Sequence, residues 1–415
     1  MNRLIFIVLF LGVIACLEWY AYSGLKVAIG GFGESAQRAI KVAFFSLTAF
    51  TVASVVLFQP MSENPASRRI LAFVVTIGLA NLLGKLLFAL FLLIDDLVRL
   101  FRWLWVTLNP KSVSPAEGSI SRMQFITQVG AVATFMPTIG MTWGIVSGAH
   151  DYRVIKREIP IKGLPSAFDG FTITQISDIH CGSFWSPDAV MRGVELVNKQ
   201  QSQVIFFTGD AVNSFATELD DWIDVFGQLS APHGVFSILG NHDYGDYVQW
   251  PDEASKAANF RHLLDLHEAM GWKLLRNENS ALSNGNEQLT IVGVENWSAR
   301  GRFHSYGDLD KALAGAPSDT VKLLLSHDPS HWRAQVLGAH PDIALTCSGH
   351  THGMQFGIEV GKLKWSPVKY FYPEWADLYT ENSQHLYVNR GFGYIGYPGR
   401  LGIRPEITVL TLRAV

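Results

Sequence analysis

The chain contains few cysteines for its length. Three cysteines occur in 415 residues, and Cys16 lies within an apolar run, so the sequence permits at most one disulfide, between Cys181 and Cys347. This scarcity excludes a scaffold held together by disulfides. We interpret Cys181 and Cys347 as small packing residues rather than as metal ligands or a disulfide pair.

The sequence also lacks an excess of positive charge. Its net charge is −3 and only 17% of its residues are charged, so no global basic field indicates a nucleic-acid partner. Hydrophobic residues make up 48% of the chain and are concentrated before residue 150. This uneven distribution is typical of a membrane protein with an attached globular domain, and it makes the lipid bilayer the first expected partner.

Four apolar stretches have about the 20 residues that a helix needs to cross a bilayer. They cover residues 4–22, 40–58, 70–94 and 125–146. The first stretch is either an uncleaved signal sequence or a retained helix, and we favour the helix because Glu18 stands where cleavage would be expected and no A-x-A site follows. The pattern predicts a transmembrane region over residues 1–150 and a soluble domain over residues 153–415.

One residue of the third span and the segment that follows this span each have two interpretations. Lys85 lies in the middle of the span, where a lone charge is costly, so it either pairs with Glu18 or Asp95 or marks a site for a lipid headgroup. Residues 96–109 place apolar side chains at helical spacing opposite two arginines. This segment is either a helix lying in the membrane interface or an extension of the third span.

The basic residues of the loops set the expected orientation of the helices. If the N-terminus lies outside the cytoplasm, most lysines and arginines of the loops fall on the inside, as the positive-inside rule requires. Four basic residues after the last span oppose this assignment: Arg153, Lys156, Arg157 and Lys162. We expect a multi-pass protein of a bacterial inner membrane, with its soluble domain on the extracytoplasmic side.

After a linker predicted over residues 147–165, short β-rich runs alternate with helical segments. The predicted strands cover residues 171–176, 204–207, 235–239, 289–292, 321–325, 343–345, 386–388 and 406–412. Helices are expected over residues 187–200, 218–228 and 253–270, and the first has Ser186 as N-cap and Pro187 at its first position. Strands alternating with helices predict an α/β fold with helices outside a layered sheet.

Side chains that can bind metals recur directly after these predicted strands. Because α/β sheets place their sites at the carboxyl ends of strands, we expect these side chains to meet. Carboxylate, imidazole and amide ligands without thiolate suit Mn, Fe or Zn. Each motif is weak alone, but five in this order are a specific pattern. The residues are Asp178, His180, Asp210, Asn241, His242, Asp243, His327, His350 and His352.

The order D-x-H, GD, GNH-D, H and GH-x-H resembles that of the calcineurin-like metallophosphoesterases, over about residues 153–415. The resemblance implies a four-layer α/β/β/α sandwich, here preceded by a bundle of about four transmembrane helices, and two divalent metal ions. It implies one metal bound by Asp178, His180, Asp210 and His352. It implies a second bound by Asp210, Asn241, His327 and His350. It also implies that His242 is the catalytic acid or transition-state stabiliser, oriented by Asp243, for which a turn or capping role is the alternative.

These roles predict a metal-dependent phosphoesterase. Two cations held close together lower the pKa of a shared water towards neutrality, so that the resulting hydroxide can attack phosphorus, and they neutralise the phosphoryl oxygens. An imidazole can protonate the leaving alkoxide near pH 7. The closer resemblance, to a membrane-linked branch, favours a phosphodiester, monoester or pyrophosphate of a lipid-linked or amphiphilic substrate. The alternative is a non-catalytic membrane scaffold or receptor that retains the fold, against which the complete motif set argues.

Two further groups of residues have open roles. Arg390 and Arg400 lie in glycine-rich loops, where they either bind phosphate or support the loops. Tyr244, Tyr247 and Trp250 follow the third motif and either line a substrate pocket or pack a lid.

Overall fold

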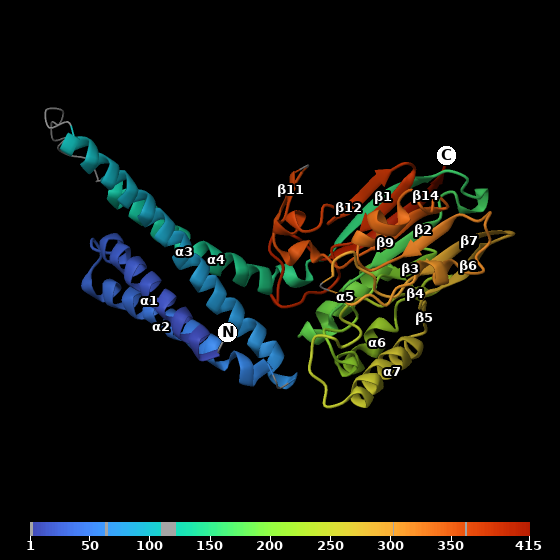
Figure 1. Cartoon of the computed structure of the whole chain (residues 1–415), viewed down its shortest axis with the longest axis horizontal. Helices are drawn as coiled ribbons and strands as arrows, with labels where there is room; N and C mark the ends of the chain where they lie inside the picture. The colour runs from blue at the N-terminus through green and yellow to red at the C-terminus, as the bar shows by residue number, and fades with distance from the viewer. Residues whose placement is uncertain (1–2, 63–64, 109–121, 302, 362) are drawn as a thin grey trace. The chain divides into compact units, whose positions relative to one another are not determined.

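The computed structural model describes residues 3–62, 65–108, 122–301, 303–361 and 363–415. The chain divides into two compact units, Met1–Trp143 and Gly144–Val415 (Figure 1). We call them the helical unit and the α/β unit.

Over its described residues, the helical unit is made of four long helices. They are α1 (Arg3–Ala28), α2 (Glu34–Ser62), α3 (Pro65–Leu108) and α4 (Arg122–Val146). Within the described residues, three segments are long and apolar enough to cross a membrane, Glu34–Leu57, Ile70–Leu108 and Gln128–His150. The first predicted span coincides with α1, although several side chains at the start of this helix lie outside the described residues.

Helix α3 continues without a break from the third predicted span through residues 96–108. No glycine or proline interrupts this stretch, and the Arg99 guanidinium pairs with the Asp95 carboxylate at 2.8 Å, one helical turn away. The structure therefore favours the extension over a separate interfacial helix.

Lys85 is buried within the helical unit and pairs with Glu18 of α1. Its ammonium also donates to the Thr48 hydroxyl at 2.5 Å and lies 3.9 Å from the centre of the Phe44 ring. Thr48 in turn donates to the same Glu18 oxygen at 2.8 Å. The structure therefore supports the interpretation in which Lys85 pairs with Glu18.

We expect Lys85→Met to destabilise the helical unit by about 3 kcal/mol, because the Glu18 carboxylate, only 14% exposed, would lose the charge that it pairs with inside the helical unit. The free energy of unfolding, measured by titration with dodecyl sulfate in mixed micelles, checks this result. The matched control is Lys85→Met with Glu18→Gln, which removes both charges and should recover most of the loss. A double variant no more stable than the single variant would contradict the prediction.

The α/β unit is built on two six-stranded sheets and one hairpin. The first sheet has the order β1 (Arg153–Ile161), β14 (Glu406–Ala414), β2 (Thr172–Ile176), β3 (Val204–Phe207), β4 (Val235–Ser237) and β5 (Trp272–Leu274). The second has the order β12 (Asp377–Glu381), β13 (Gln384–Val388), β9 (Ile343–Ser348), β8 (Lys322–Leu325), β7 (Glu287–Gly293) and β6 (Glu278–Asn284). The hairpin joins β10 (Ile358–Val360) and β11 (Leu363–Trp365).

The two sheets pack face to face, with helical segments on both outer faces. The core between the sheets includes Phe206 of β3 and Leu345 of β9. Helices α5 (Pro187–Asn198), α6 (Ile223–Phe226) and α7 (Glu253–Ala269) cover the outer face of the first sheet around Phe207 (Figure 1). Helix α8 (Leu309–Leu313) and a π-helical turn, Trp332–Val336, pack on the second sheet around Leu324. The four-layer α/β/β/α arrangement is confirmed.

The linker predicted over residues 147–165 is wrong, because strand β1 lies in the middle of it, over Arg153–Ile161. This strand pairs in parallel with β14 at the edge of the first sheet. Ile155, Ile159 and Ile161 are buried, but the charged run Lys156-Arg157-Glu158 lies between them and obscures the strand pattern.

Both sheets direct the carboxyl ends of parallel strands to one region. Strands β2, β3 and β4 are parallel neighbours in the first sheet, as are β8 and β9 in the second. The loops that follow these five strands carry all nine predicted site residues.

Candidate metal centre

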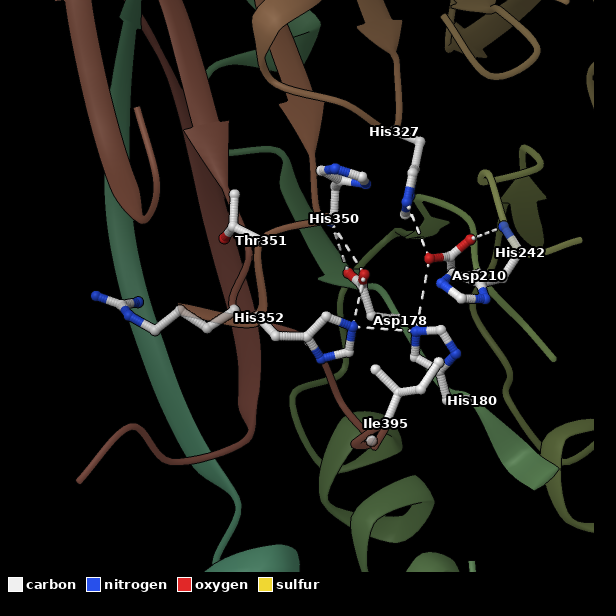
Figure 2. A network of polar contacts seen from close by, with 12 residues as sticks. Asp178, His180, Asp210, His242, His327, His350, Thr351, His352 and Ile395 are labelled. Atoms are coloured by element: carbon white, nitrogen blue, oxygen red, sulfur yellow. Dashed lines mark hydrogen bonds and ion pairs between the residues drawn. The ribbon is translucent and has the colours of Figure 1, made fainter. Parts of the chain in front are cut away.

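The loops bring the predicted carboxylates and imidazoles into one buried cluster. Figure 2 shows Asp178 and Asp210 facing the imidazoles of His180, His327 and His352. Two groups of three residues each place one ligand atom per residue within 4.8 Å of one another. The first group is Asp178, His180 and His352, and the second is Asp178, Asp210 and His327.

In the first group, imidazole nitrogens converge on a carboxylate. The Nε2 atoms of His180 and His352 lie 3.0 Å apart, and Nε2 of His352 lies 3.1 Å from Oδ1 of Asp178. Convergent imidazole and carboxylate lone pairs are a donor set for a divalent cation. Asp178 and His180 have no exposed surface, and His352 is 6% exposed.

Asp210 of the second group faces one imidazole of each group, and these imidazoles follow strands of different sheets. Its Oδ2 atom lies 3.1 Å from Nε2 of His327 and 3.5 Å from Nε2 of His180. Asp210 therefore has contacts on both sides of the cluster, as a bridging ligand would. The structure also brings Asp178 to this group, where the resemblance had implied Asn241 and His350 beside Asp210 and His327.

Asn241 and His350 form a neighbouring pair. Oδ1 of Asn241 lies 2.7 Å from Nδ1 of His350, so the two candidate ligand atoms face each other. The opposite ring nitrogen of His350 lies 2.8 Å from the Tyr372 hydroxyl, which donates to Asp328 at 3.2 Å. Such outer contacts hold a ligand imidazole in one orientation.

Backbone carbonyls orient two other imidazoles. Nδ1 of His180 lies 3.2 Å from the Val212 carbonyl oxygen, and Nδ1 of His327 lies 2.7 Å from that of Thr208. Donation from Nδ1–H to a carbonyl leaves Nε2, the nitrogen that faces Asp210, as the atom able to bind a metal. These tautomers are the ones that metal binding requires.

Five of the candidate ligand residues have a left-handed backbone although none is glycine. Their φ angles are 52° at Asp178, 48° at His180, 61° at Asp210, 73° at His350 and 51° at His352. This conformation is costly for residues with a side chain, and it persists where the surrounding structure imposes it, as happens at functional sites. The left-handed turns point the side chains back towards the centre.

The cluster attracts positive charge. Burial opposes ionisation of Asp178, but the neighbouring His352 and His327 outweigh it and hold the pKa of Asp178 well below its usual range. Burial also disfavours the charged form of His327 and would lower its pKa, but the Asp210 carboxylate raises this pKa to about 10. The proton on His327 thus balances part of the negative charge of the two carboxylates. A divalent cation bound in the cluster would balance that charge instead and displace the proton.

The orienting role expected of Asp243 is wrong. Its carboxylate accepts hydrogen bonds from the backbone N–H groups of Gly240, Asp210 and Ala211 at 2.8–2.9 Å. Asp243 is therefore the turn residue that the sequence left as its alternative, and it fastens the loops after β3 and β4 together. Nδ1 of His242 instead contacts the carbonyl oxygen of Asn213, at 2.8 Å.

Sequence reasoning missed several residues beside the cluster. The Arg300 guanidinium lies 4.3 Å from the centre of the Tyr372 ring, and the Phe303 ring meets His350 edge to face at 4.9 Å. The Tyr247 hydroxyl accepts a hydrogen bond from Asn241 at 2.8 Å. Of these residues the sequence had singled out only Tyr247, which follows the GNH-D motif, whereas Arg300, Phe303 and Tyr372 belong to no motif.

Both loop arginines support the backbone and acidic side chains. Arg400 is buried and donates to the carbonyl oxygens of Arg390 at 2.8 Å and Gly393 at 2.9 Å. Arg390 pairs with Glu406 and, at 3.1 Å, with Glu359. The structure favours the loop-support interpretation over phosphate binding.

The cysteines form no disulfide. Cys181 and Cys347 are buried and are not joined to each other, and Cys347 lies in the core between the sheets. The interpretation as packing residues is confirmed.

Comparison with known families gives two matches. Residues 171–354 match the family described as calcineurin-like phosphoesterase. Residues 2–149 match a family described as probable calcineurin-like phosphoesterase, transmembrane domain. The two matches cover most of the helical unit and the part of the α/β unit that holds the motifs.

Individual relatives carry similar descriptions. The "Transmembrane protein with metallophosphoesterase domain" of Bos taurus is 31% identical over 312 residues, which cover 72% of this chain and 66% of that protein. Its counterpart in Danio rerio is 29% identical over 308 residues, covering 72% and 65%. The "Uncharacterized metallophosphoesterase YkuE" of Bacillus subtilis is 29% identical over 302 residues, covering 71% and 98%. The aligned region thus spans less than two thirds of the two vertebrate proteins.

Proposed function

Because this chain belongs to the calcineurin-like metallophosphoesterase family and carries its transmembrane domain, we propose that it hydrolyses a phosphate ester at a membrane. The observation that carries the proposal is the convergence of three imidazoles on two buried carboxylates, with Nδ1 of His180 and His327 held by backbone carbonyls so that Nε2 faces the centre. No thiolate takes part in the two groups, so the donor set suits Mn, Fe or Zn.

We assign the metal-binding role to seven residues. When bound, divalent cations supply charge neutralisation for phosphoryl oxygens and a nucleophile at neutral pH. Asp210 keeps the two halves of the site together, because it contacts imidazoles on both sides. The residues are Asp178, His180, Asp210, Asn241, His327, His350 and His352.

His242 is the proposed proton donor to the leaving group. Its ring is half-buried, and the Asn213 carbonyl holds Nδ1, so Nε2 is the atom able to exchange a proton with substrate. The Tyr247 ring lies 4.6 Å away and fixes the plane of the imidazole. Asp243 acts through the loop backbone and is a positioning residue.

We propose a phosphodiester, monoester or pyrophosphate of a lipid-linked or amphiphilic molecule as substrate. The transmembrane domain supports this class, since it keeps the α/β unit at a bilayer. Aromatic side chains beside the ligands, Tyr247, Phe303 and Tyr372, favour a substrate with an apolar or planar group next to the phosphate. An extracytoplasmic location of the α/β unit remains our prediction.

Hydrolysis of bis-p-nitrophenyl phosphate and p-nitrophenyl phosphate by the purified full chain tests the proposal. We expect turnover with added Mn²⁺ and none after chelation, and the ratio of the two rates separates diesterase from monoesterase activity. A panel of phospholipids then defines the substrate class. A chain that binds no metal and hydrolyses nothing would overturn the proposal and leave a non-catalytic scaffold.

A further inference from the structure

The hairpin β10–β11 has its charged side chains facing the protein and its apolar side chains facing outward. Successive residues of a strand point to opposite faces. Glu359 and Lys364 are directly paired across the hairpin and share one face, while Val360 pairs with Leu363 on the other face. This arrangement inverts the usual one for a surface hairpin, in which the apolar face is buried.

Ion pairs fix the charged face against the α/β unit. The Glu359 carboxylate, only 7% exposed, lies 3.1 Å from the guanidinium groups of Arg153 and Arg390. Lys364 pairs with Asp377, the first residue of β12. These contacts hold the hairpin in one orientation, so exposure of the opposite face is a built feature of the fold.

The outward face is strongly apolar. Ile358, Val360 and Leu363 are 48%, 71% and 61% exposed. The chain then continues into the helical turn Pro367–Tyr370, where exposed Lys369 precedes Tyr370 at 71% and Phe371 at 54% exposure. We call these six residues, Ile358, Val360, Leu363, Lys369, Tyr370 and Phe371, the apolar hairpin surface.

The apolar hairpin surface is continuous in sequence with the candidate metal centre. The candidate ligands His350 and His352 come shortly before β10. Tyr372, whose hydroxyl lies 2.8 Å from Nε2 of His350, directly follows Phe371. The residues of the apolar hairpin surface are therefore close in sequence to residues of the candidate metal centre.

We infer that the apolar hairpin surface enters the headgroup region of the lipid bilayer. Contiguous exposed apolar side chains on a soluble unit mark an interaction surface, and aromatic rings beside a lysine are the composition that favours the membrane interface. The chain itself supplies the bilayer, because it carries spanning helices. Six residues separate the end of α4 at Val146 from the start of β1 at Arg153, so even a weak surface affinity acts at high effective concentration.

Contact between the apolar hairpin surface and the bilayer also bears on the substrate, and this part of the inference rests on the proposed function. A surface that enters the headgroup region brings the candidate metal centre to the depth at which lipid phosphates lie. The substrate class that follows is a phosphate ester in the headgroup of a membrane lipid, taken from the bilayer without release into water.

A fluorescent label on the surface tests the contact independently of hydrolysis. The full chain with Cys16→Ser and Val360→Cys, labelled with nitrobenzoxadiazole, is placed at one copy per nanodisc of phosphatidylethanolamine and phosphatidylglycerol. Cys181 and Cys347 are buried and should not react. We expect blue-shifted emission that 5-doxyl lipid quenches more than 12-doxyl lipid, because an interfacial surface enters by about 5–10 Å.

The matched control carries the label at Val415→Cys. Val415 is 75% exposed and lies in the same unit, at the end opposite to β11 (Figure 1), so its emission should stay that of a water-exposed label. Water-like, unquenched emission at position 360 would overturn the inference. Blue-shifted emission that doxyl lipids do not quench would overturn it as well, since protein rather than lipid would then cover the surface.

A charge variant links the contact to turnover. We expect Ile358→Glu with Leu363→Glu to abolish the quenching and to lower hydrolysis of phospholipid in the same nanodiscs about tenfold, with hydrolysis of bis-p-nitrophenyl phosphate unchanged. Equal losses on both substrates would remove the link to substrate access. Absence of turnover on every substrate would count against the proposed function alone, because the quenching of the position-360 label decides the membrane contact separately.

Discussion

Asp210→Asn is expected to lower turnover by about four orders of magnitude and to remove at least one metal from the purified protein. The Asp210 carboxylate lies between His180 and His327 and is 2% exposed. Solvent therefore cannot compensate for the loss of its negative charge. An amide keeps the shape of the side chain but offers a single neutral oxygen. Metal content by mass spectrometry and the rate on bis-p-nitrophenyl phosphate are measured on the same sample.

The matched control for this variant is Asp220→Asn. Asp220 is an exposed carboxylate in the outer helical layer, and one of its oxygens lies 2.7 Å from Nε2 of His262. Asp220→Asn should keep both metals and full turnover. If Asp210→Asn also kept its metals and rate, Asp210 would not be a ligand and the assignment of the cluster would fail.

His242→Ala is expected to lower kcat on an alkyl phosphate ester by about a hundredfold to a thousandfold while the metals stay bound. His242 belongs to neither group of convergent ligands, and its Nδ1 atom is held by the Asn213 carbonyl. Loss of the ring therefore removes a proton donor and leaves the metal sites intact. The loss should be much smaller for a p-nitrophenyl ester, whose leaving group needs no proton.

His262→Ala is the control for this experiment, because His262 is an exposed histidine of the same unit that pairs with a surface carboxylate. Its kcat should match that of the parent chain on both esters. An equal loss for alkyl and p-nitrophenyl esters in His242→Ala would assign the imidazole to transition-state stabilisation rather than to proton donation. Loss of metal would make it a ligand.

The sequence was sufficient for the fold class and for the residues of the cluster. Strand β3 occupies the predicted residues 204–207. The length of this apolar run decided the prediction, because four residues between polar loops are enough for a strand but too few for a helix. Strand β1 was missed because three charged residues interrupt its apolar alternation, and its partner β14 lies far along the chain. Local patterns carry no information on such distant pairing.

The finer parts of the site could not be read from sequence. Asp243 follows His242 directly, which suggested a contact, but neighbouring residues in a turn point in different directions and the carboxylate satisfies backbone amides instead. Tyr372 reaches His350 from a loop without a motif. The left-handed backbone at Asp178 and His352 is equally invisible, because residue type alone would predict the opposite.

Strand β14 lies between β1 and β2 in the first sheet, although it is synthesised after every other strand. While the ribosome is still producing residues 162–405, β1 has no partner and the edge of β2 stays open. Pairing across so long a loop is slow, so the α/β unit can close only after its last strand has emerged, when the helices before it have long been available for insertion. The order of strands thus makes membrane insertion the earlier event and leaves an unpaired edge for chaperones to shield in the interval.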